Sequence, residues 1–332
     1  MRLAVVGAGA VGGTLAALLD RGGHDVVVTA QGESLEVIRR AGIELSGAWG
    51  EYVAHVVASE VLDSTPDIAF VCVKAQDAAA AIESNAARLA GSVVVVVQNG
   101  LDGVERARRL LPESRCVGAV AVFAADRWSR GRVTVATPGP LLVGEGGGEP
   151  SQAAVQVATV MAQVMPCEAV SNFTGVQWTK LVVNQVNAVP AITGLSAQEV
   201  LSDRQLRRII AASMREVMRT GRALGVRFGS VPGLDHGAVR LLAGPLPVGQ
   251  LLLLASRRRL GSTPVTGSTL QSIRWGRSTE IDHLTGAVAS RAAAVGRSAP
   301  VSAVFTELVH EVERTGRFLS PAELVQRVGP VS

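Results

Sequence analysis

Aromatic residues are scarce in this chain of 332 residues, where phenylalanine, tryptophan and tyrosine together make up 3%. Proteins that bind single-stranded nucleic acid stack bases on aromatic side chains, so this scarcity argues against that class. An excess of one charge is also lacking, because 32 basic residues stand against 28 acidic ones with no long basic block. We therefore expect no nucleic-acid partner.

Cysteine is nearly absent, with three widely separated residues, Cys72, Cys116 and Cys167. Their odd number and the lack of a CxxC pair argue against a disulfide framework. No histidine stands at ligand spacing from a cysteine, so we predict no metal site. This pattern is typical of a reducing compartment, and we expect the cytoplasm.

Long uncharged apolar runs are missing as well. The N-terminus has an arginine followed by an apolar stretch, as a signal peptide has, but glycines interrupt this stretch and Asp20-Arg21 ends it. No other segment approaches the roughly 18 apolar residues that a membrane-spanning helix requires. We expect no membrane partner. The assembly state stays open, with a homodimer among the alternatives.

Apolar residues are plentiful, at 48% of the chain, which is enough for the cores of two domains. The first half alternates valine-rich runs with alanine-rich helical patterns. The runs that are apolar on both faces, as buried parallel strands are, lie at Arg2–Val6, Asp25–Thr29, Ile68–Val73 and Val93–Val97. The helical patterns lie at Val11–Arg21, Ser34–Arg40, Ala75–Leu89 and Val104–Leu111. This alternation predicts an α/β fold with a Rossmann-type doubly wound sheet.

The remaining elements complete this domain and predict a second one. We expect a hairpin in Gly42–Ser59, strands at Cys116–Phe123, Arg132–Val135, Leu141–Val143 and Glu168–Val170, and a helix at Gln152–Val164. Strand signals fade after Asn172, and helical patterns follow at 172–193, 199–224, 268–275, 279–295, 300–314 and 321–328. The proline-rich stretch 229–264 is expected to be irregular with one short helix. We predict a dinucleotide-binding domain over 1–170 and an all-helical substrate and catalytic domain over 171–332.

The segment Gly7-Ala8-Gly9-Ala10-Val11-Gly12 fits the GxGxxG pattern between a predicted strand and a predicted helix. Gly7 would allow the tight turn, Gly9 would let a pyrophosphate approach the backbone, and Gly12 would let the helix pack on the strand. Ala10 and Val11 would begin a helix whose free N–H groups attract phosphates. We predict that this segment binds a dinucleotide.

The second strand ends at Gln31, without an acidic residue for a free ribose 2′-hydroxyl and without an arginine for a 2′-phosphate. The remaining candidates to meet a 2′-phosphate are Ser34, Arg39, Arg40 and Lys74. We favour NADP as the cofactor, and NAD stays open. Lys74 and Asn99 each follow a predicted strand at the edge where open α/β sheets bind ligands, although Asn99-Gly100 is also an ordinary turn signal.

In the apolar stretch 172–193, Lys180 precedes Asn184 by one helical turn on the same stripe. An amine among aliphatic residues loses hydration, which lowers its pKa toward the range where it donates a proton. The alternative is that Lys180 reaches solvent.

A second polar segment, 268–282, leaves two interpretations open for its acids. Glu280 follows Ser278-Thr279, which suits a helix N-cap, so it is either an acid at a helix start or a functional carboxylate. Ser268 lies upstream, where it is the first residue of another segment that begins with polar residues. The cluster Arg257–Arg259 is left without a predicted role.

These motifs resemble the ketopantoate reductase (2-dehydropantoate 2-reductase) family. They are GAGAVG at 7–12, VKAQD at 73–77, QNG at 98–100, WTKLVVN at 178–184 and STLQSIRWGRSTEID at 268–282. The resemblance implies a Rossmann domain joined to a helical domain, and the reduction of a 2-oxo acid with NADPH.

The resemblance also implies roles for single residues. Lys180 would be the general acid, and Glu280 would bind the hydroxyl of the substrate. Asn99 and Asn184 would position substrate and nicotinamide, and Ser268 would contact the substrate carboxylate. The chemistry agrees, because hydride delivery to a ketone builds negative charge on oxygen, which a fixed cationic donor stabilises.

The chain departs from the family pattern at three places. The family often has an Asn-Pro step at the positions that correspond to 188 and 189. In this chain the asparagine comes one residue earlier, as Asn187, and the proline comes one residue later, as Pro190. We still assign Asn187 to the substrate. Ser196-Ala197-Gln198 replaces a Pro-Asn-Gly, and Gln31 replaces an arginine. These departures leave the identity of the substrate open.

Two other functions compete with this one. An imine or opine reductase would use Lys180 on a different carbonyl or imine. A dinucleotide sensor without turnover would be expected to lose its catalytic positions, whereas Lys180, Asn99 and Glu280 are all present.

Overall fold

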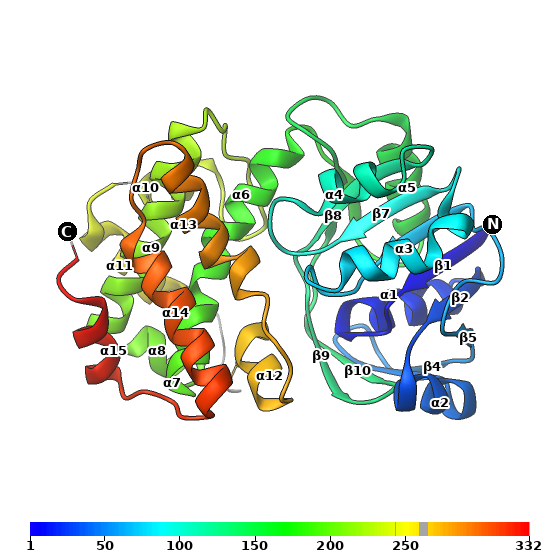
Figure 1. The fold of residues 1–332 in the computed structure, drawn as a ribbon, viewed down its shortest axis with the longest axis horizontal. Helices are drawn as coiled ribbons and strands as arrows, with labels where there is room; N and C mark the ends of the chain where they lie inside the picture. Colours follow the sequence, from blue (N-terminus) through cyan, green and yellow to red (C-terminus); the bar gives the residue numbers. More distant parts are fainter. Residues whose placement is uncertain (243, 259–264, 332) are drawn as a thin grey trace. The chain divides into compact units, whose positions relative to one another are not determined.

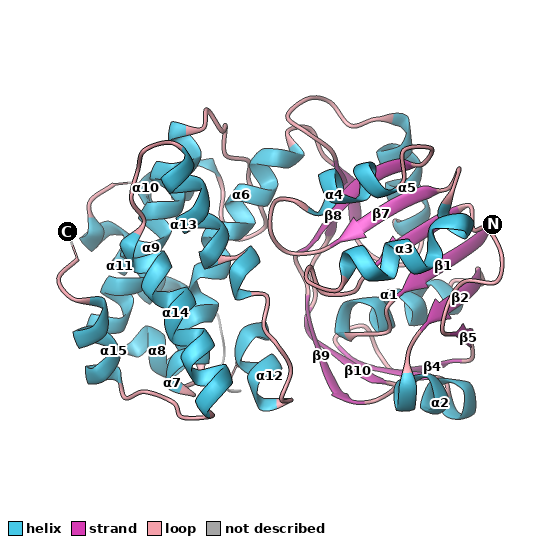
Figure 2. Cartoon of the chain, viewed as in Figure 1, coloured by secondary structure: helices cyan, strands magenta, loops and turns pink. Residues whose placement is uncertain are grey.

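The computed structural model describes residues 1–242, 244–258 and 265–331. The chain divides into two compact units, Met1–Thr174 and Gly175–Ser332, and each is described by itself. The predicted domain boundary at residue 170 falls shortly before the end of the first unit. All named strands belong to the first unit, and the second is helical (Figure 2). Arg259 of the predicted arginine cluster lies outside the described residues.

The first unit is built on an eight-stranded sheet with the strand order β12-β11-β8-β7-β6-β1-β2-β5. Figure 1 labels β8, β7, β1, β2 and β5 of this sheet. Its strands are β1 (Arg2–Val6), β2 (Asp25–Thr29), β5 (Val57–Ser59), β6 (Ile68–Val71), β7 (Val93–Val97), β8 (Arg115–Ala121), β11 (Leu141–Gly144) and β12 (Cys167–Ala169). Neighbouring strands run parallel, with the exception of β8 and β11. The predicted doubly wound sheet is confirmed.

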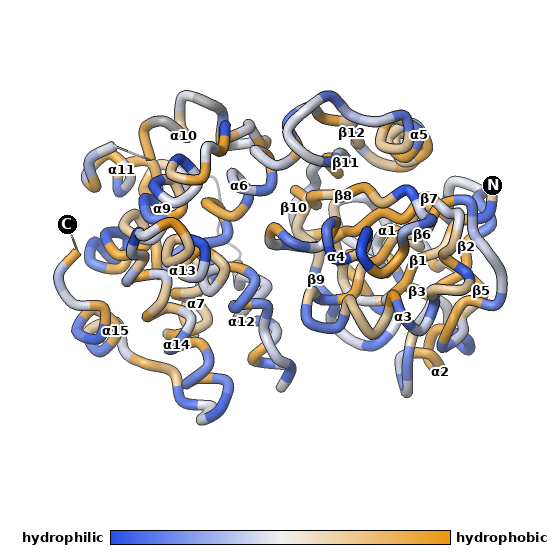
Figure 3. The backbone as a smooth tube through the Cα atoms, turned by 45° about the horizontal axis from the view of Figure 1, so that its top comes forward, coloured by the Kyte–Doolittle hydropathy of each residue, from blue (hydrophilic) through white to orange (hydrophobic). Residues whose placement is uncertain are grey.

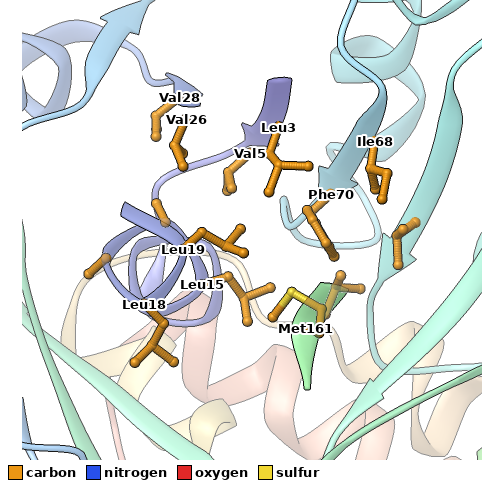
Figure 4. Packing of buried hydrophobic residues seen from close by; sticks show 14 of the residues in the cluster. Leu3, Val5, Leu15, Leu18, Leu19, Val26, Val28, Ile68, Phe70 and Met161 are labelled. Atoms are coloured by element: carbon orange, nitrogen blue, oxygen red, sulfur yellow. The ribbon is translucent and has the colours of Figure 1, made fainter. Parts of the chain in front are cut away.

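Helices cover both faces of this sheet because its strands are apolar on both sides. The helices are α1 (Ala10–Arg21), α2 (Gly32–Ala41), α3 (Ala78–Leu89), α4 (Gly103–Leu110) and α5 (Gln152–Met161). Leu3 and Val5 of β1 belong to the core that holds Leu15 of α1 and Met161 of α5 (Figure 4). The alternate residues of β1 lie in the opposite core, with α3 and α4. The all-valine strand β7 is accordingly hydrophobic along its length (Figure 3).

A second sheet has the order β4-β3-β10-β9. Its strands are β3 (Ile43–Gly47), β4 (Tyr52–Ala54), β9 (Ala124–Ser129) and β10 (Arg132–Thr137). The hairpin of β3 and β4 was predicted, but β9 was not. None of the six residues of β9 is buried, and Trp128 is 70% exposed, so β9 lacks the apolar alternation that marks a half-buried strand.

The second unit consists of helices. They are α6 (Phe173–Asn184), the short 3-10 helix η1 (Gln185–Asn187), α7 (Ala188–Thr193), α8 (Ala197–Ser202), α9 (Arg204–Ala223), α10 (His236–Leu242), α11 (Leu246–Arg257), α12 (Ser268–Arg274), the short 3-10 helix η2 (Ile281–His283), α13 (Thr285–Ala294), α14 (Pro300–Thr315) and α15 (Pro321–Val328). In the described residues, no helix has both the length and the apolarity that crossing a bilayer requires.

Several helix predictions for this unit need correction. The helix expected over 199–224 is divided at Asp203, whose extended backbone ends α8 and whose side chain caps α9. The single helix expected over 172–193 is interrupted by η1, because Pro190 has no N–H to donate to the carbonyl four residues earlier. The described part of the stretch 229–264 holds the two helices α10 and α11 instead of one short helix. Its prolines are compatible with α11 because Pro245 is the N-cap and Pro247 lies in the first turn, where the missing N–H costs nothing.

Glu216 of α9 is buried and caps the neighbouring helix α14. Its carboxylate accepts hydrogen bonds from the N–H groups of Val301 and Ser302, both at 2.8 Å, and from the Ser302 hydroxyl at 2.7 Å. The N-cap residue of α14 is Ala299, which has no side-chain acceptor. Burial raises the pKa of Glu216, and these hydrogen bonds oppose the rise.

Candidate functional site

The loop after β1 has the geometry of a phosphate-binding turn. Gly7 has a φ of +101°, and a Cβ atom there would lie 2.5 Å from Val73 Cγ1 at the end of β6. A Cβ atom on Gly12 would overlap the carbonyl oxygen of Gly7. A Cβ atom on Gly9 would meet no protein atom within 4 Å. Gly7 and Gly12 therefore close the turn, and Gly9 leaves open space in front of the backbone.

The helix α1 begins directly after this turn. Gly9 is its N-cap and supplies no side-chain hydrogen bond, so the N–H groups of Ala10 and Val11 have no partner within the helix. No acidic residue lies in the first turn to compete with an anion. Open space, free N–H groups and the positive end of the helix dipole together fit the diphosphate of a dinucleotide.

The ends of β6 and β7 lie at the same edge of the sheet as Gly7. Strands β1, β6 and β7 are parallel neighbours, and the strand order reverses at β1, which makes this edge the usual ligand-binding edge of an open sheet. The Gln98 side-chain amide donates a hydrogen bond to the Val73 carbonyl at 2.8 Å and joins the two strand ends. Lys74 and Asn99 come directly after these residues, so both lie at the predicted edge.

Of the candidates for a 2′-phosphate, only some lie at the carboxyl end of β2. Gln31 is exposed and is the N-cap of α2, and Ser34 lies in the first turn of that helix. Arg39 and Arg40 lie in its last turn, about 10 Å further along the axis. Arg39 also donates a hydrogen bond to the Ala58 carbonyl at 3.0 Å. The two arginines are therefore removed from the end that Gln31 occupies.

Arg130 was not among the predicted site residues, and its side chain lies against α2 in the fold. Its guanidinium lies 2.7 Å from the carboxylate of Glu33, which belongs to the first turn of α2. Arg130 lies between β9 and β10. Because β9 has no apolar alternation, a contact between this turn and α2 could not be predicted from a local pattern.

In the second unit, α6 carries Lys180 and Asn184 one turn apart. Asn184 is 6% exposed and Lys180 is partly buried. Burial lowers the pKa of Lys180, as expected for an amine that loses hydration. Thr179 fixes the same helix, because its hydroxyl lies 2.7 Å from the Gly229 carbonyl and 2.9 Å from the Gly175 carbonyl.

Lysine occurs at only two positions of the whole chain, Lys74 and Lys180, while the other 30 basic residues are arginines. Arginine cannot release its proton in a protein, whereas a buried lysine amine can. The rarity of lysine is therefore a further signal, available in the sequence, that these two positions need an amine.

The residue after Asn184 holds the end of α6 in place. The Gln185 side chain is fully buried, donates to the Leu181 carbonyl at 3.0 Å and accepts from the Ser213 hydroxyl at 2.6 Å. These bonds tie α6 to α9 and restrict the turn that carries Asn184.

Asn187 lies close to Ser268 because it packs against Gly267, the residue before Ser268. A Cβ atom on Gly267 would lie 2.6 Å from Asn187 Oδ1, so Asn187 packs directly beside the start of α12. Ser268 is the first residue of α12 and is exposed. Two of the predicted substrate residues are thus neighbours.

The segment Ser196-Ala197-Gln198, which departs from the family pattern, has a structural role near this point. The Ala197 N–H donates to the Val265 carbonyl at 2.8 Å, and the Val265 N–H donates to Gln198 Oε1 at 2.9 Å. Ala197 is itself buried, with 8% of its surface exposed. These residues hold the chain that leads to Gly267 and Ser268.

The N-cap predicted at Ser278-Thr279 is wrong, since α13 begins at Thr285. The backbone of Leu284, with φ −108° and ψ −95°, separates α13 from η2, and Glu280 precedes η2. The dipole of a long helix therefore does not explain the acid at position 280. Its neighbour Thr279 instead donates its N–H to Glu313 of α14 at 2.6 Å.

Comparison with known proteins identifies the family. Two family models match the chain, ketopantoate reductase PanE/ApbA over residues 3–148 and the ketopantoate reductase PanE/ApbA C terminal over residues 172–313. The chain belongs to the ketopantoate reductase family. The resemblance seen in the sequence is thereby confirmed.

Relatives in this family match along nearly the whole chain. The 2-dehydropantoate 2-reductase of Archaeoglobus fulgidus is 28% identical over 314 residues, which are 94% of this chain and 98% of the relative. The crystal structure of a PanE/ApbA family ketopantoate reductase from Ralstonia eutropha JMP134 has a TM-score of 0.79 and 28% identity, covering 95% of this chain and 99% of that one. A ternary structure of D-mandelate dehydrogenase with NADH and anilino(oxo)acetate shares the fold, with a TM-score of 0.81, 19% identity and coverage of 95% and 99%.

Proposed function

We propose that this protein reduces a 2-oxo acid to a 2-hydroxy acid with NADPH, as a 2-dehydropantoate 2-reductase that converts ketopantoate to pantoate. The observation that carries the proposal is the partly buried amine of Lys180, whose pKa is lowered, in a chain of the ketopantoate reductase family. The first unit binds the dinucleotide, and the second supplies the acid and the substrate contacts. The three cysteines are free, in keeping with a cytoplasmic enzyme.

Lys180 acts as the general acid of the reaction. A bound reduced nicotinamide supplies the hydride to the carbonyl carbon. As that carbon is reduced, negative charge grows on its oxygen, and the Lys180 ammonium stabilises this charge more strongly than it stabilises the neutral ketone. The amine then gives its proton to the oxygen, which completes the hydroxyl group. A pKa lowered by burial makes this transfer easier at neutral pH.

The other predicted residues orient the substrate. Glu280 accepts a hydrogen bond from a hydroxyl of the substrate, and Ser268 donates one to its carboxylate. Asn187 lies beside Ser268 and binds the same part of the substrate, its carboxylate end. Asn99 and Asn184 position the substrate and the nicotinamide, Asn99 from the end of β7 and Asn184 from α6.

The cofactor is held by the first unit. The turn of Gly7, Gly9 and Gly12 and the start of α1 receive the diphosphate, because they combine open space with free N–H groups. Gln31, the N-cap of α2, would meet the ribose that distinguishes NADP from NAD, and Lys74 lies at the same edge of the sheet. We propose NADPH, with NADH as a slower alternative, because Gln31 carries neither the acid that selects NAD nor the arginine that grips a 2′-phosphate.

A second candidate substrate is a 2-oxo acid other than ketopantoate. Ala197 stands where the family pattern has an asparagine that helps bind ketopantoate. Because Ala197 is buried and Gln198 is engaged with Val265, neither side chain replaces that asparagine. Lys180 and Glu280 would then perform the same reduction on a different side group.

The test is cofactor oxidation by the purified full chain. NADPH or NADH is mixed with ketopantoate, with other alkyl and aryl 2-oxo acids, and with cyclic imines, and the absorbance of the reduced cofactor is followed. Loss of absorbance with ketopantoate supports the proposal, and loss with another 2-oxo acid alone supports the second candidate. Oxidation with imines only would assign the protein to the imine reductases. Tight binding of NADPH without turnover of any compound would contradict a catalytic function.

A further inference from the structure

His310 of α14 is held on both sides by carboxylates. Its Nε2 atom lies 2.9 Å from Asp282 Oδ1, and its Nδ1 atom lies 2.7 Å from Glu313 Oε2. A neutral imidazole carries a proton on only one nitrogen, so both contacts are favourable hydrogen bonds only when the ring is protonated. The arrangement therefore fits an imidazolium ion between two carboxylates.

The same carboxylate of Glu313 also holds the backbone next to Glu280. Its second oxygen accepts the N–H of Thr279 at 2.6 Å. Thr279 and Asp282 lie on either side of Glu280 in the chain, and both are thereby bound to α14. We call Thr279, Asp282, His310 and Glu313 the His310 clamp.

The clamp acts on a short segment that is anchored by the buried side chain of Ile281 and forms one 3-10 turn. The His283 N–H donates to the Glu280 carbonyl at 2.9 Å and forms the single turn of η2. A 3-10 turn of three residues has poorer hydrogen bonds than an α-helix and needs outside contacts to keep its shape. The contacts from α14 are therefore well placed to decide where Glu280 lies.

We propose that His310 is a positioning residue for Glu280: its protonated ring holds the segment 279–283 on α14, and loss of the ring proton leaves only one of the two ring contacts, which loosens this hold and weakens binding of the 2-oxo acid. The inference rests on the proposed function, because it assumes that Glu280 contacts the substrate. The charged groups that act on the ring are Asp282, from η2, and Glu313, from α14 itself.

The pH range of the clamp follows from the titrations of its members. Burial lowers the pKa of His310, but the hydrogen bonds and charges of Asp282 and Glu313 outweigh burial and raise it above the ordinary value of 6.5. Burial raises the pKa of Glu313, and the hydrogen bonds from Thr279 and His310 outweigh burial and lower it. The clamp is thus complete below pH 6.5, down to the acid range where Glu313 takes up a proton, and it loses one of its ring contacts as pH rises through the raised pKa of His310.

The first test compares His310→Gln with the wild type in steady-state kinetics from about pH 6 to about pH 9, the range around the titration of a histidine. At pH 6 the variant should raise KM for the 2-oxo acid about tenfold, the effect of losing one charged hydrogen bond. The ratio of the two KM values should fall toward one above the pKa of His310. The kcat and the affinity for NADPH should stay unchanged, and His283→Gln, in the same segment, should behave as the wild type. A KM ratio that is the same at all pH values, or that equals one throughout, would overturn the inference.

The second test does not depend on turnover. The His310 ring is titrated by NMR in the full chain and in Glu313→Gln. The ring should titrate above pH 6.5 in the wild type and at a lower pH in the variant. Titration at or below 6.5 in the wild type would overturn the inference even if the enzyme is active. If the ring titrates as expected while no 2-oxo acid is reduced, the proposed function fails and the clamp itself stands.

Discussion

The Oδ1 atom of Asn187 lies 2.6 Å from the place that a Cβ atom on Gly267 would take. The φ of Gly267 is −66°, which any residue can adopt, so the contact with Asn187 alone restricts this position to glycine. The contact links the turn after α6 to the start of α12, where Ser268 lies.

Gly267→Ala should therefore displace Asn187 from Ser268. We expect KM for the 2-oxo acid to rise about tenfold, as for the loss of one hydrogen bond, with the affinity for NADPH unchanged. Steady-state kinetics and a cofactor titration measure the two effects. Gly148→Ala is the control, because a Cβ atom there meets no atom within 4 Å. An unchanged KM in Gly267→Ala would show that Asn187 does not serve the substrate.

Lys180→Met should lower kcat by about a hundredfold or more, the usual contribution of a general acid, while NADPH still binds. In the wild type, kcat should fall as pH rises through the pKa of Lys180, which burial lowers from the ordinary value of 10.5. Reductive methylation with a ¹³C label gives a direct measurement, because the chain has only two lysine amines besides its terminal amine. A Lys180 signal that titrates at 10.5, or full activity of Lys180→Met, would contradict its assignment as the acid.

The same substitution should make the protein more stable at neutral pH. A lowered pKa means that the folded state holds the Lys180 proton less tightly than the unfolded state does, so the charged amine costs stability below the folded pKa. Lys180→Met removes this cost, so we expect the free energy of unfolding to increase. The gain should shrink as pH approaches 10.5. Denaturant unfolding at several pH values measures this gain in stability. A loss of stability at pH 7 would show that burial of the charged amine does not destabilise the folded state.

Gly9→Ala and Gly12→Ala form a matched pair in the phosphate-binding turn. Gly9→Ala should fold with a stability within about 1 kcal/mol of the wild type, because its methyl group meets only open space. It should bind NADPH more weakly, since the methyl group occupies the approach of the diphosphate. Gly12→Ala should lose several degrees in melting temperature, because its methyl group would overlap the Gly7 carbonyl. Tight binding of NADPH to Gly9→Ala would place the diphosphate elsewhere.

Gln31→Arg should favour NADPH over NADH. Gln31 is exposed at the carboxyl end of β2, where an added guanidinium can meet a 2′-phosphate. We expect KM for NADPH to fall about tenfold and KM for NADH to stay unchanged. Arg40→Gln, in the last turn of α2, should alter neither value. A fall in both values would indicate a general gain of positive charge in place of contact with the 2′-phosphate.

The elements that follow simple periodicity could be predicted from the sequence, and those that depend on distant contacts could not. The strand β7 is a run of five valines, and its burial on both faces follows from composition alone. The strand β9 pairs with β10 although none of its residues is buried, so no apolar pattern marks it.

In the candidate site too, some features could be predicted from local sequence patterns and others could not. Lys180 and Asn184 are separated by four residues on one helix, so their alignment follows from helix geometry. The turn at Glu280 was predicted as part of a helix because its carboxylates suit a helix start. The N–H of Thr279 instead binds Glu313, which lies 34 residues further along, and a local pattern cannot show such a contact.

Because Glu216 of α9 caps α14, the first turn of α14 lacks this acceptor until the two helices pack together. The amide protons of Val301 and Ser302 should then exchange with solvent only when α9 and α14 separate, which makes the two helices one cooperative folding unit. His310 and Glu313 lie further along the same helix. The segment that carries Glu280 is bound to α14 through Glu313 and His310, so it should lose its order whenever this unit opens.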